Sequence, residues 1–206
     1  MSLTTEEVDI CNQSLYKIGA NAFTFADQAG VQALRCIAHY AQTRDALLRS
    51  YWWRMARARA VLAQDTNDPD FEWDNQFKLP EDFLRLRSVY EESGTTSKSR
   101  RHALEGQRFL TNLSAVSIRY VAKITDTTKF DPLFIEILIL LLAQKLLGPL
   151  AGGGSKLGKE IRDDLKKLTP KAQAVDMDET DTGGRSDWNL ARHGGIGIEG
   201  SDERFW

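Results

Sequence analysis

The chain has 206 residues, 42% hydrophobic and 27% charged, and is therefore long enough to build one domain with a sizeable core plus appendages. Its formal net charge of −2 and its pI near 6.0 argue against the broad electrostatic capture of nucleic acid that strongly basic proteins show. Two cysteines are too few for a disulfide framework; they fit a reduced compartment and the role of small buried hydrophobes.

A first helix is predicted to begin at Thr4. Thr4 and Glu7 have the spacing of a capping box, in which a hydroxyl and a carboxylate satisfy backbone N–H groups at a helix start. Gly19 stands where a helix commonly ends. Steps of three and four residues predict an apolar face made of Val8, Cys11, Leu15 and Ile18. No apolar targeting segment occurs near this start, so we expect synthesis in the cytoplasm.

A second, longer helix is predicted over residues 31–50, with Asp27 available to cap it. Its predicted apolar face consists of Leu34, Ile37, Ala41 and Leu48, and its polar face of Arg35, Gln42, Arg44, Asp45 and Arg49. Asp45 and Arg49 are four residues apart and are expected to pair on the surface.

An aromatic and basic stretch follows this helix. Tyr51, Trp52 and Trp53 are expected to pack in the core, with an anchor between subunits as the alternative. Arg54, Arg57 and Arg59 alternate with smaller residues, a pattern that fits either a strand with a basic face or a short helix. For these arginines a solvated or intersubunit salt-bridge surface is favoured over DNA contact.

A β region is predicted at about residues 71–125, after a turn-rich break that contains Pro69. The strand-like stretches are 77–79, 83–90, 108–111 and 116–124. In the last of these, strict alternation places Ile118, Tyr120, Ala122 and Ile124 on one face, and Ser117, Arg119, Val121 and Lys123 on the other.

The most apolar helix is predicted to start at Asp131-Pro132 and to be the central helix of the fold. Its apolar run, 133–147, is shorter than the ~20 residues that a membrane span needs. Residues 148–154 are expected to break it, and a last helix is predicted over 156–177, interrupted or kinked at Pro170. The predicted fold class is therefore mainly α (α+β): an antiparallel helical bundle over 1–177 with a small antiparallel β insertion.

Residues 178–206 form a predicted extended C-terminal arm. This segment is rich in Gly, Asp and Ser and cannot bury enough apolar surface to fold alone. It nevertheless holds several aromatic residues, among them Trp188, Phe205 and Trp206. Two interpretations remain open: an arm that becomes ordered on a partner, or a disordered end.

Motifs for chemistry are not supported by their context. The GxGxxG at 195–200 has no preceding strand, and the GxxxxGK at 153–159 follows a helix and lacks the Ser or Thr that binds magnesium. His39, His102 and His193 have no second ligand at metal spacing, and no serine lies in a nucleophile elbow. The sequence therefore predicts no catalytic, cofactor-binding or metal-binding residues.

Several segments together resemble the head-to-tail adaptor (tail tubular protein A) family of short-tailed bacteriophages. They are DICNQSLYKIGA, the helix with Arg44–Arg49, the step Trp52-Trp53, KLPEDFLRLR, SIRYVAKITDTTKFDPLF and the WNLAR piece at Trp188. The similarity covers nearly the whole chain. It implies a mostly helical bundle with a small β element, made in the host cytoplasm and located at the head–tail junction of a virion.

The resemblance implies a structural role without enzyme activity. Family members assemble as a ring, expected here as a dodecamer, beneath the portal protein; the ring closes the packaged head and offers a platform to the tail nozzle, tail tubular protein B. DNA would pass through the channel without sequence-specific binding, and no membrane partner is implied. We expect partner contacts from Trp188, Arg192, Phe205 and Trp206, and secondarily from Arg54, Arg57 and Arg59. The alternatives are a tail-associated cell-wall hydrolase and a small DNA-binding protein.

Overall fold

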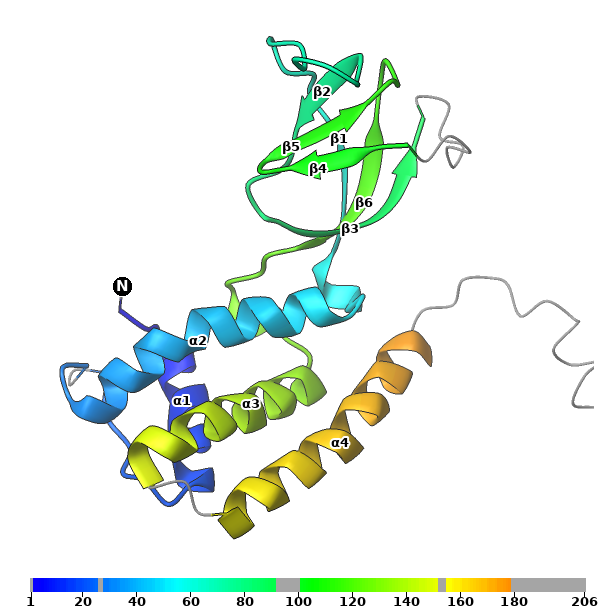
Figure 1. Ribbon diagram of the computed structural model, residues 1–206. Coiled ribbons are helices and arrows are strands. Elements are labelled where there is room, and N and C mark those ends of the chain that lie inside the picture. Colours follow the sequence, from blue (N-terminus) through cyan, green and yellow to red (C-terminus); the bar gives the residue numbers. More distant parts are fainter. Residues whose placement is uncertain (1, 26–27, 92–100, 152–154, 179–206) are drawn as a thin grey trace, which may run out of the picture.

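The fold divides into a helical part and a β unit (Figure 1). The structure is a computed structural model that describes residues 2–25, 28–91, 101–151 and 155–178. Within these ranges, four helices pack together and two three-stranded antiparallel sheets stand at one end of them. This confirms the predicted fold class, a helical bundle with a small antiparallel β element. The predicted arm lies, from residue 179 onward, outside the described residues.

Helix α1 spans Thr5–Lys17 and begins as its sequence predicts. The Glu7 backbone N–H donates to Thr4 Oγ1 at 3.3 Å, and the Thr4 N–H donates to Glu7 Oε2 at 2.9 Å, which completes the capping box. Gly19, with a φ of 71°, takes the left-handed backbone that follows many helix ends. The predicted apolar face is buried in full: Val8, Cys11, Leu15 and Ile18.

Helix α2 has the predicted bounds, Val31–Ser50, but its buried face differs from the prediction. Leu34 and Ala41 are exposed, whereas Arg44 is 4% exposed. The face that packs on the other helices is Ala33, Cys36, Tyr40, Thr43, Arg44, Leu47 and Leu48. Arg44 is tolerated there because two carboxylates neutralise its charge. The expected cap, Asp27, lies outside the described residues, and Gly30 is the N-cap.

Helix α3, Pro132–Ala151, is the central helix, as predicted. Asp131 caps it by accepting the Leu133 N–H at 2.8 Å, and α1, α2 and α4 all contact it. The apolar stretch is longer than the predicted run 133–147, because the helix continues to Ala151: Pro132–Leu150 is long enough to cross a membrane by length and composition. Half of that stretch is buried against the other helices, as expected of a core helix.

The C-terminal part of the bundle departs from the predicted helix ends. Helix α3 continues through Gly148 and Pro149, and α4, Ser155–Asp178, runs through Pro170, so the break expected at 148 comes later. Proline removes one backbone donor, a cost that packing on both sides can offset. Around Pro170 that packing comes from Leu168 before it and Ala172 after it, both in contact with the core.

The β unit consists of two sheets. The first, sheet A, has the order β1-β6-β3, and the second, sheet B, has the order β2-β5-β4. The strands are β1 Arg57–Val61, β2 Asn75–Lys78, β3 Phe83–Tyr90, β4 Ala103–Glu105, β5 Arg108–Thr111 and β6 Ser117–Ala122. The β unit therefore begins at Arg57, before the predicted boundary near 71. The pattern of Arg54, Arg57 and Arg59 fits either a strand or a short helix, and this stretch forms a 3₁₀ turn followed by β1.

The two sheets enclose a small core of their own. Phe77 and Phe109 of sheet B pack with Ile118, Tyr120 and Ala122 of β6, which confirms the predicted inward face of that strand. Ile124 packs instead against the helical core, because β6 ends two residues earlier. The opposite face of sheet A meets the helices through Val121, which belongs to the helical core.

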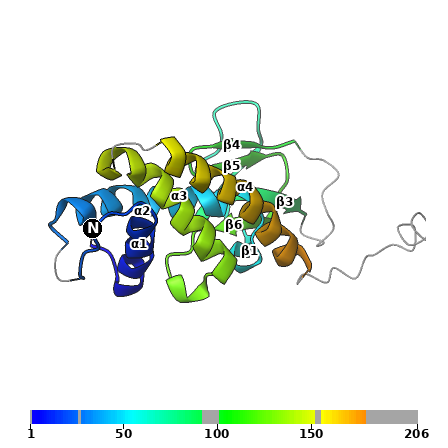
Figure 2. The same ribbon diagram turned by 90° about the horizontal axis from the view of Figure 1, so that it is seen from below.

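The chain crosses between the two parts twice (Figure 1). Seen from below, helices α1–α4 lie in front of the two sheets (Figure 2). The chain leaves α2 through Trp53, which is 1% exposed and packs edge-on against Phe134 at 5.4 Å between ring centroids. This confirms core packing for Trp53, whereas Trp52 is only half-buried. The chain returns to the helical part through the segment between β6 and α3. The C-terminal ends of α2 and α4 come to the same side as this crossing, next to sheet A (Figure 1).

Candidate functional site: an arginine-rich sheet face

The C-terminal turn of α4 is fastened to the start of β1 by one carboxylate. Asp176 is 9% exposed and accepts the Arg54 backbone N–H at 2.9 and 3.1 Å. It also accepts Nη2 of Arg57 at 3.3 Å. The Arg57 guanidinium donates to the Trp52 carbonyl and lies over the Trp52 ring, 5.6 Å from its centroid. Arg57 is thus engaged within the subunit, at the joint between helices and β unit.

Arg54 and Arg59 occupy different positions. The Arg54 side chain is exposed on the 3₁₀ turn Arg54–Ala56, while Arg59 is exposed on β1. The three arginines that the sequence groups together therefore do not act as one set. Alternation along β1 puts Arg57 and Arg59 on the face of sheet A that is turned away from sheet B, since Ala58 and Ala60 pack toward the β core.

Sheet pairing brings further arginines to this face. Arg59 stands directly opposite Arg119 of β6, and Arg119 in turn is opposite Ser88 of β3. Arg85 pairs with Val121 in register and donates from Nη1 to the Ser50 carbonyl at 3.2 Å. Arg87 reaches over the Trp52 ring at 6.0 Å. We call these five residues the arginine face: Arg57, Arg59, Arg85, Arg87 and Arg119.

The end of the arginine face farther from the helices is hollowed. A groove of about 340 Å³ is lined by Arg59, Ala60, Val61, Tyr90, Ser117, Ile118 and Arg119. Val61 is 81% exposed, the most exposed large hydrophobic residue in the described part of the chain. The Arg119 guanidinium stacks over the Tyr90 ring at 5.1 Å from its centroid.

The electrostatics of the groove are unfavourable in the isolated subunit. Like charges directly opposite each other on an antiparallel pair destabilise it, and Arg59 and Arg119 are such a pair. Neither Arg59 nor Arg119 has an ion pair with a carboxylate among the described residues, whereas Arg57 of the same face is paired with Asp176. An anionic partner that also offers apolar surface would relieve the repulsion and cover Val61.

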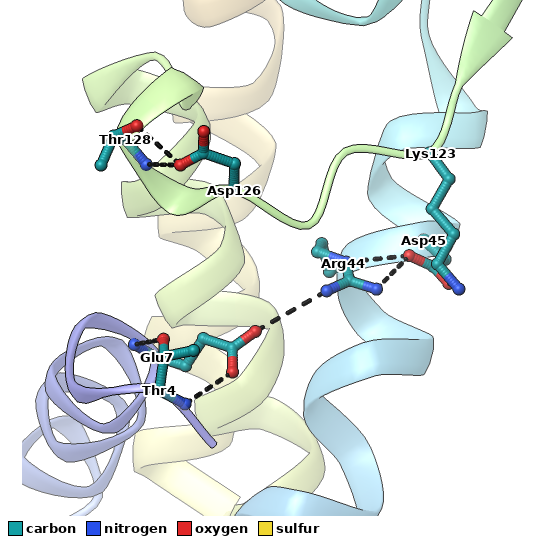
Figure 3. Close-up of polar contacts among 7 residues, drawn as sticks. All are labelled: Thr4, Glu7, Arg44, Asp45, Lys123, Asp126 and Thr128. Atoms are coloured by element: carbon teal, nitrogen blue, oxygen red, sulfur yellow. Dashed lines mark hydrogen bonds and ion pairs between the residues drawn. The ribbon is translucent and has the colours of Figure 1, made fainter. Parts of the chain in front are cut away.

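A second polar cluster joins α1, α2 and the chain returning from β6 (Figure 3). Glu7 lies 3.7 Å from Arg44, Arg44 lies 2.8 Å from Asp45, and Asp45 lies 3.3 Å from Lys123. Asp45 therefore pairs with Arg44 and Lys123, whereas Arg49, its expected partner, donates to the Leu84 carbonyl. These ion pairs between side chains connect α1, α2 and the segment that follows β6.

Titratable groups lie buried beside this cluster. The Tyr40 hydroxyl has no hydrogen-bond partner among the described residues, and burial raises its pKa. The hydrogen bond to Cys36, together with burial, raises the pKa of the Cys11 thiol. Both cysteines are free and buried, in agreement with their predicted role as small hydrophobes. These groups contact one another and the packed helices, and we assign the cluster a structural role.

The predicted contacts in the C-terminal arm, and the GxGxxG at 195–200, lie outside the described residues. These predicted contacts are Trp188, Arg192, Phe205 and Trp206. Gly158 of the GxxxxGK sits inside α4, where an added Cβ would come within 3.1 Å of a Leu147 methyl carbon, so close packing of α4 on α3 accounts for this glycine. Within the described ranges, no group of three His, Cys, Asp or Glu residues is arranged to hold a metal ion.

Sequence reasoning missed Arg85, Arg87 and Arg119 as members of the site. Alternation in β6 already separated Arg119 from the buried residues Ile118 and Tyr120, but the pairing of Arg119 with Arg59 depends on strand order. No protein-family model matches the chain, and no curated protein matches it.

Proposed function

We propose that this protein is a structural head-to-tail adaptor of a short-tailed phage virion. In this role, copies of the chain form a ring beneath the portal protein, close the packaged head and present a platform for the tail nozzle. The fold supports the proposal, because a helical bundle with a small antiparallel β element is what the family resemblance implies. The observation that carries it is the groove between Arg59 and Arg119, an exposed, charged and partly apolar surface suited to protein contact.

On this proposal the protein acts by binding to its neighbours in the virion, and the free energy of these contacts is what it contributes. The helices and the two sheets supply a rigid shape, and residues 179–206, which follow α4 directly beside the Asp176 joint, supply contacts to neighbours. Trp188, Arg192, Phe205 and Trp206 are the proposed contacts in that segment. A portal that offers all its docking sites in one ring makes each weak contact effective through multivalency. Packaged DNA passes through the channel without sequence-specific binding.

Mixing with the portal protein of the same virus tests the proposal. The chain alone is expected to elute as a monomer or weak oligomer, and to co-elute with portal as a ring visible by negative-stain imaging. A deletion of residues 179–206 is expected to keep the helical circular dichroism and lose the ring. Failure of the full-length chain to co-elute with portal, at any ratio, would count against an adaptor role.

A second candidate function, DNA binding, is favoured by one observation: the arginine face presents Trp52 and Tyr90 among its guanidinium groups. Arginine and aromatic side chains together suit nucleic acid backbones and bases. That function predicts an affinity for duplex or single-stranded DNA that falls steeply as salt is raised. A flat salt response, measured by fluorescence anisotropy of a labelled oligonucleotide, would remove it.

A further inference from the structure

The β unit carries, at its far end from the helices, an acidic loop over residues 65–74 between β1 and β2 (Figure 1). Its five carboxylates belong to Asp65, Asp68, Asp70, Glu72 and Asp74. At its centre the Phe71 side chain is 79% exposed, the second most exposed large hydrophobic residue in the described part of the chain after Val61. An exposed phenyl ring flanked by carboxylates has the chemistry that the arginine groove lacks.

Hydrogen bonds within the subunit define the conformation of the acidic loop. The buried Gln76 side chain donates to the Asn67 carbonyl at 2.6 Å, and the Trp73 N–H donates to the Phe71 carbonyl at 2.9 Å. Glu72 takes a φ of 70°, a left-handed backbone that is uncommon for a residue other than glycine. Such strain persists where surrounding contacts impose it, and it is often found at binding sites. The fixed loop keeps Phe71 pointing out of the subunit.

Part of the loop charge is already balanced within the subunit, and part is not. Asp65 lies 3.6 Å from Arg108, and Glu72 lies 3.9 Å from Arg101. Asp68 and Asp70 are exposed, and no ion pair joins either of them to the described residues. Asp74, on the other side of Phe71, is likewise exposed and has no ion pair among the described residues. Of these three carboxylates, Asp68 and Asp70 lie on the N-terminal side of Phe71 and are opposite in sign to the two arginines of the groove.

We propose that the acidic loop of one copy docks into the arginine groove of the next copy around the ring. Phe71 covers Val61 and the apolar floor of the groove, while Asp68 and Asp70 meet Arg59 and Arg119. In a ring each copy offers its loop to one neighbour and its groove to the other, so the proposed contact is heterologous and closes when its rotation allows. The occupant is a second copy of this chain, and the inference rests on the proposed ring function.

Cross-linking between copies tests the contact without any partner. A chain with Val61→Cys and Phe71→Cys, treated with a short bismaleimide at high protein concentration, is expected to give a ladder of cross-linked oligomers. The single variants V61C and F71C are the matched controls, because each supplies only one side of the contact. Cys11 and Cys36 are buried and do not contribute. A double variant that cross-links no more than the single variants overturns the proposal.

Charge reversal then tests the chemistry. R59E/R119E in the V61C/F71C background is expected to reduce the ladder at least about tenfold, because like charges then face each other across the contact. Adding D68K/D70K to the same chain restores complementarity and is expected to restore the ladder. Arg35→Glu, an exposed arginine on α2 away from the β unit, is the control and should change nothing. Loss without recovery in the combined variant refutes the pairing.

The outcomes separate this contact from the proposed function. Rings on portal whose assembly is indifferent to R59E/R119E overturn the loop–groove contact and leave the adaptor role standing. A ladder that obeys the charge swap, in a chain that ignores portal, supports the contact and counts against the adaptor role. Capture of a DNA oligonucleotide by the groove, abolished by R59E/R119E and accompanied by no ladder, overturns the contact in favour of nucleic acid.

Discussion

Asp176→Asn isolates the ionic part of the joint between α4 and β1. Asparagine keeps the size of the side chain and one oxygen that can accept the Arg54 N–H, but it removes the charge that faces Arg57 at 3.3 Å. The side chains of Arg57 and Asp176 are 20% and 9% exposed. Breaking a fully buried pair costs about 3–5 kcal/mol and an exposed pair less than about 1 kcal/mol. The intermediate burial gives an expected loss of about 2 kcal/mol.

The measurement is urea unfolding followed by tryptophan fluorescence, together with thermal melting. For a domain of this size about 2 kcal/mol corresponds to a Tm lower by roughly 4–8 °C. The matched control is Asp163→Asn on the same helix, whose partner Lys166 is 3.8 Å away with side chains 45% and 78% exposed. That exposed pair should contribute below about 0.5 kcal/mol. Equal losses for D176N and D163N would refute the assignment of Asp176 as the fastening of the joint.

Three further predictions concern the two cores. Burial, together with the hydrogen bond to Asp82, raises the pKa of Tyr120 from 10.0 to about 12. The stabilising contribution of the protonated hydroxyl is therefore present below pH 10 and is lost as the pH rises toward 12. The fall in Tm over that interval should be shallower in Tyr120→Phe. Cys11 and Cys36 should react with Ellman's reagent only as the chain unfolds, and fast reaction in the native state would contradict their burial. Phe134→Ala, at a fully buried position, should cost about 3–5 kcal/mol in urea unfolding, and a loss under about 1 kcal/mol would exclude it from the core.

Local patterns predict the helices well in this chain. The bounds of α2 and the capping box at Thr4 follow from the sequence because both depend on residues within a few positions of each other. The buried face of α2 does not, because Arg44 is buried by virtue of Glu7 and Asp45, and Glu7 belongs to another helix. From sequence alone, a charged residue such as Arg44 is predicted to be exposed, because the carboxylates that pair with it are not known.

The candidate site depends almost wholly on long-range pairing. Arg59 and Arg119 are sixty residues apart by their numbers and become neighbours only through the β1–β6 register. Nothing local in either strand specifies that register, and β1 itself was ambiguous because a run of alternating arginine and alanine suits a strand or a short helix. The role of Asp176 in holding Arg57 was invisible for the same reason.

The way in which the β unit is attached has a consequence for how such a chain can diversify. Its first and last strands enter and leave side by side, since Arg57 and Val121 are register partners. Facing residues of antiparallel strands have Cα atoms about 4.5–5.5 Å apart, a gap that a few residues of linker can close. A different insert whose ends lie equally close together would meet the same two anchor points, and it would have to replace the contacts that Arg57 and Val121 make with the helices.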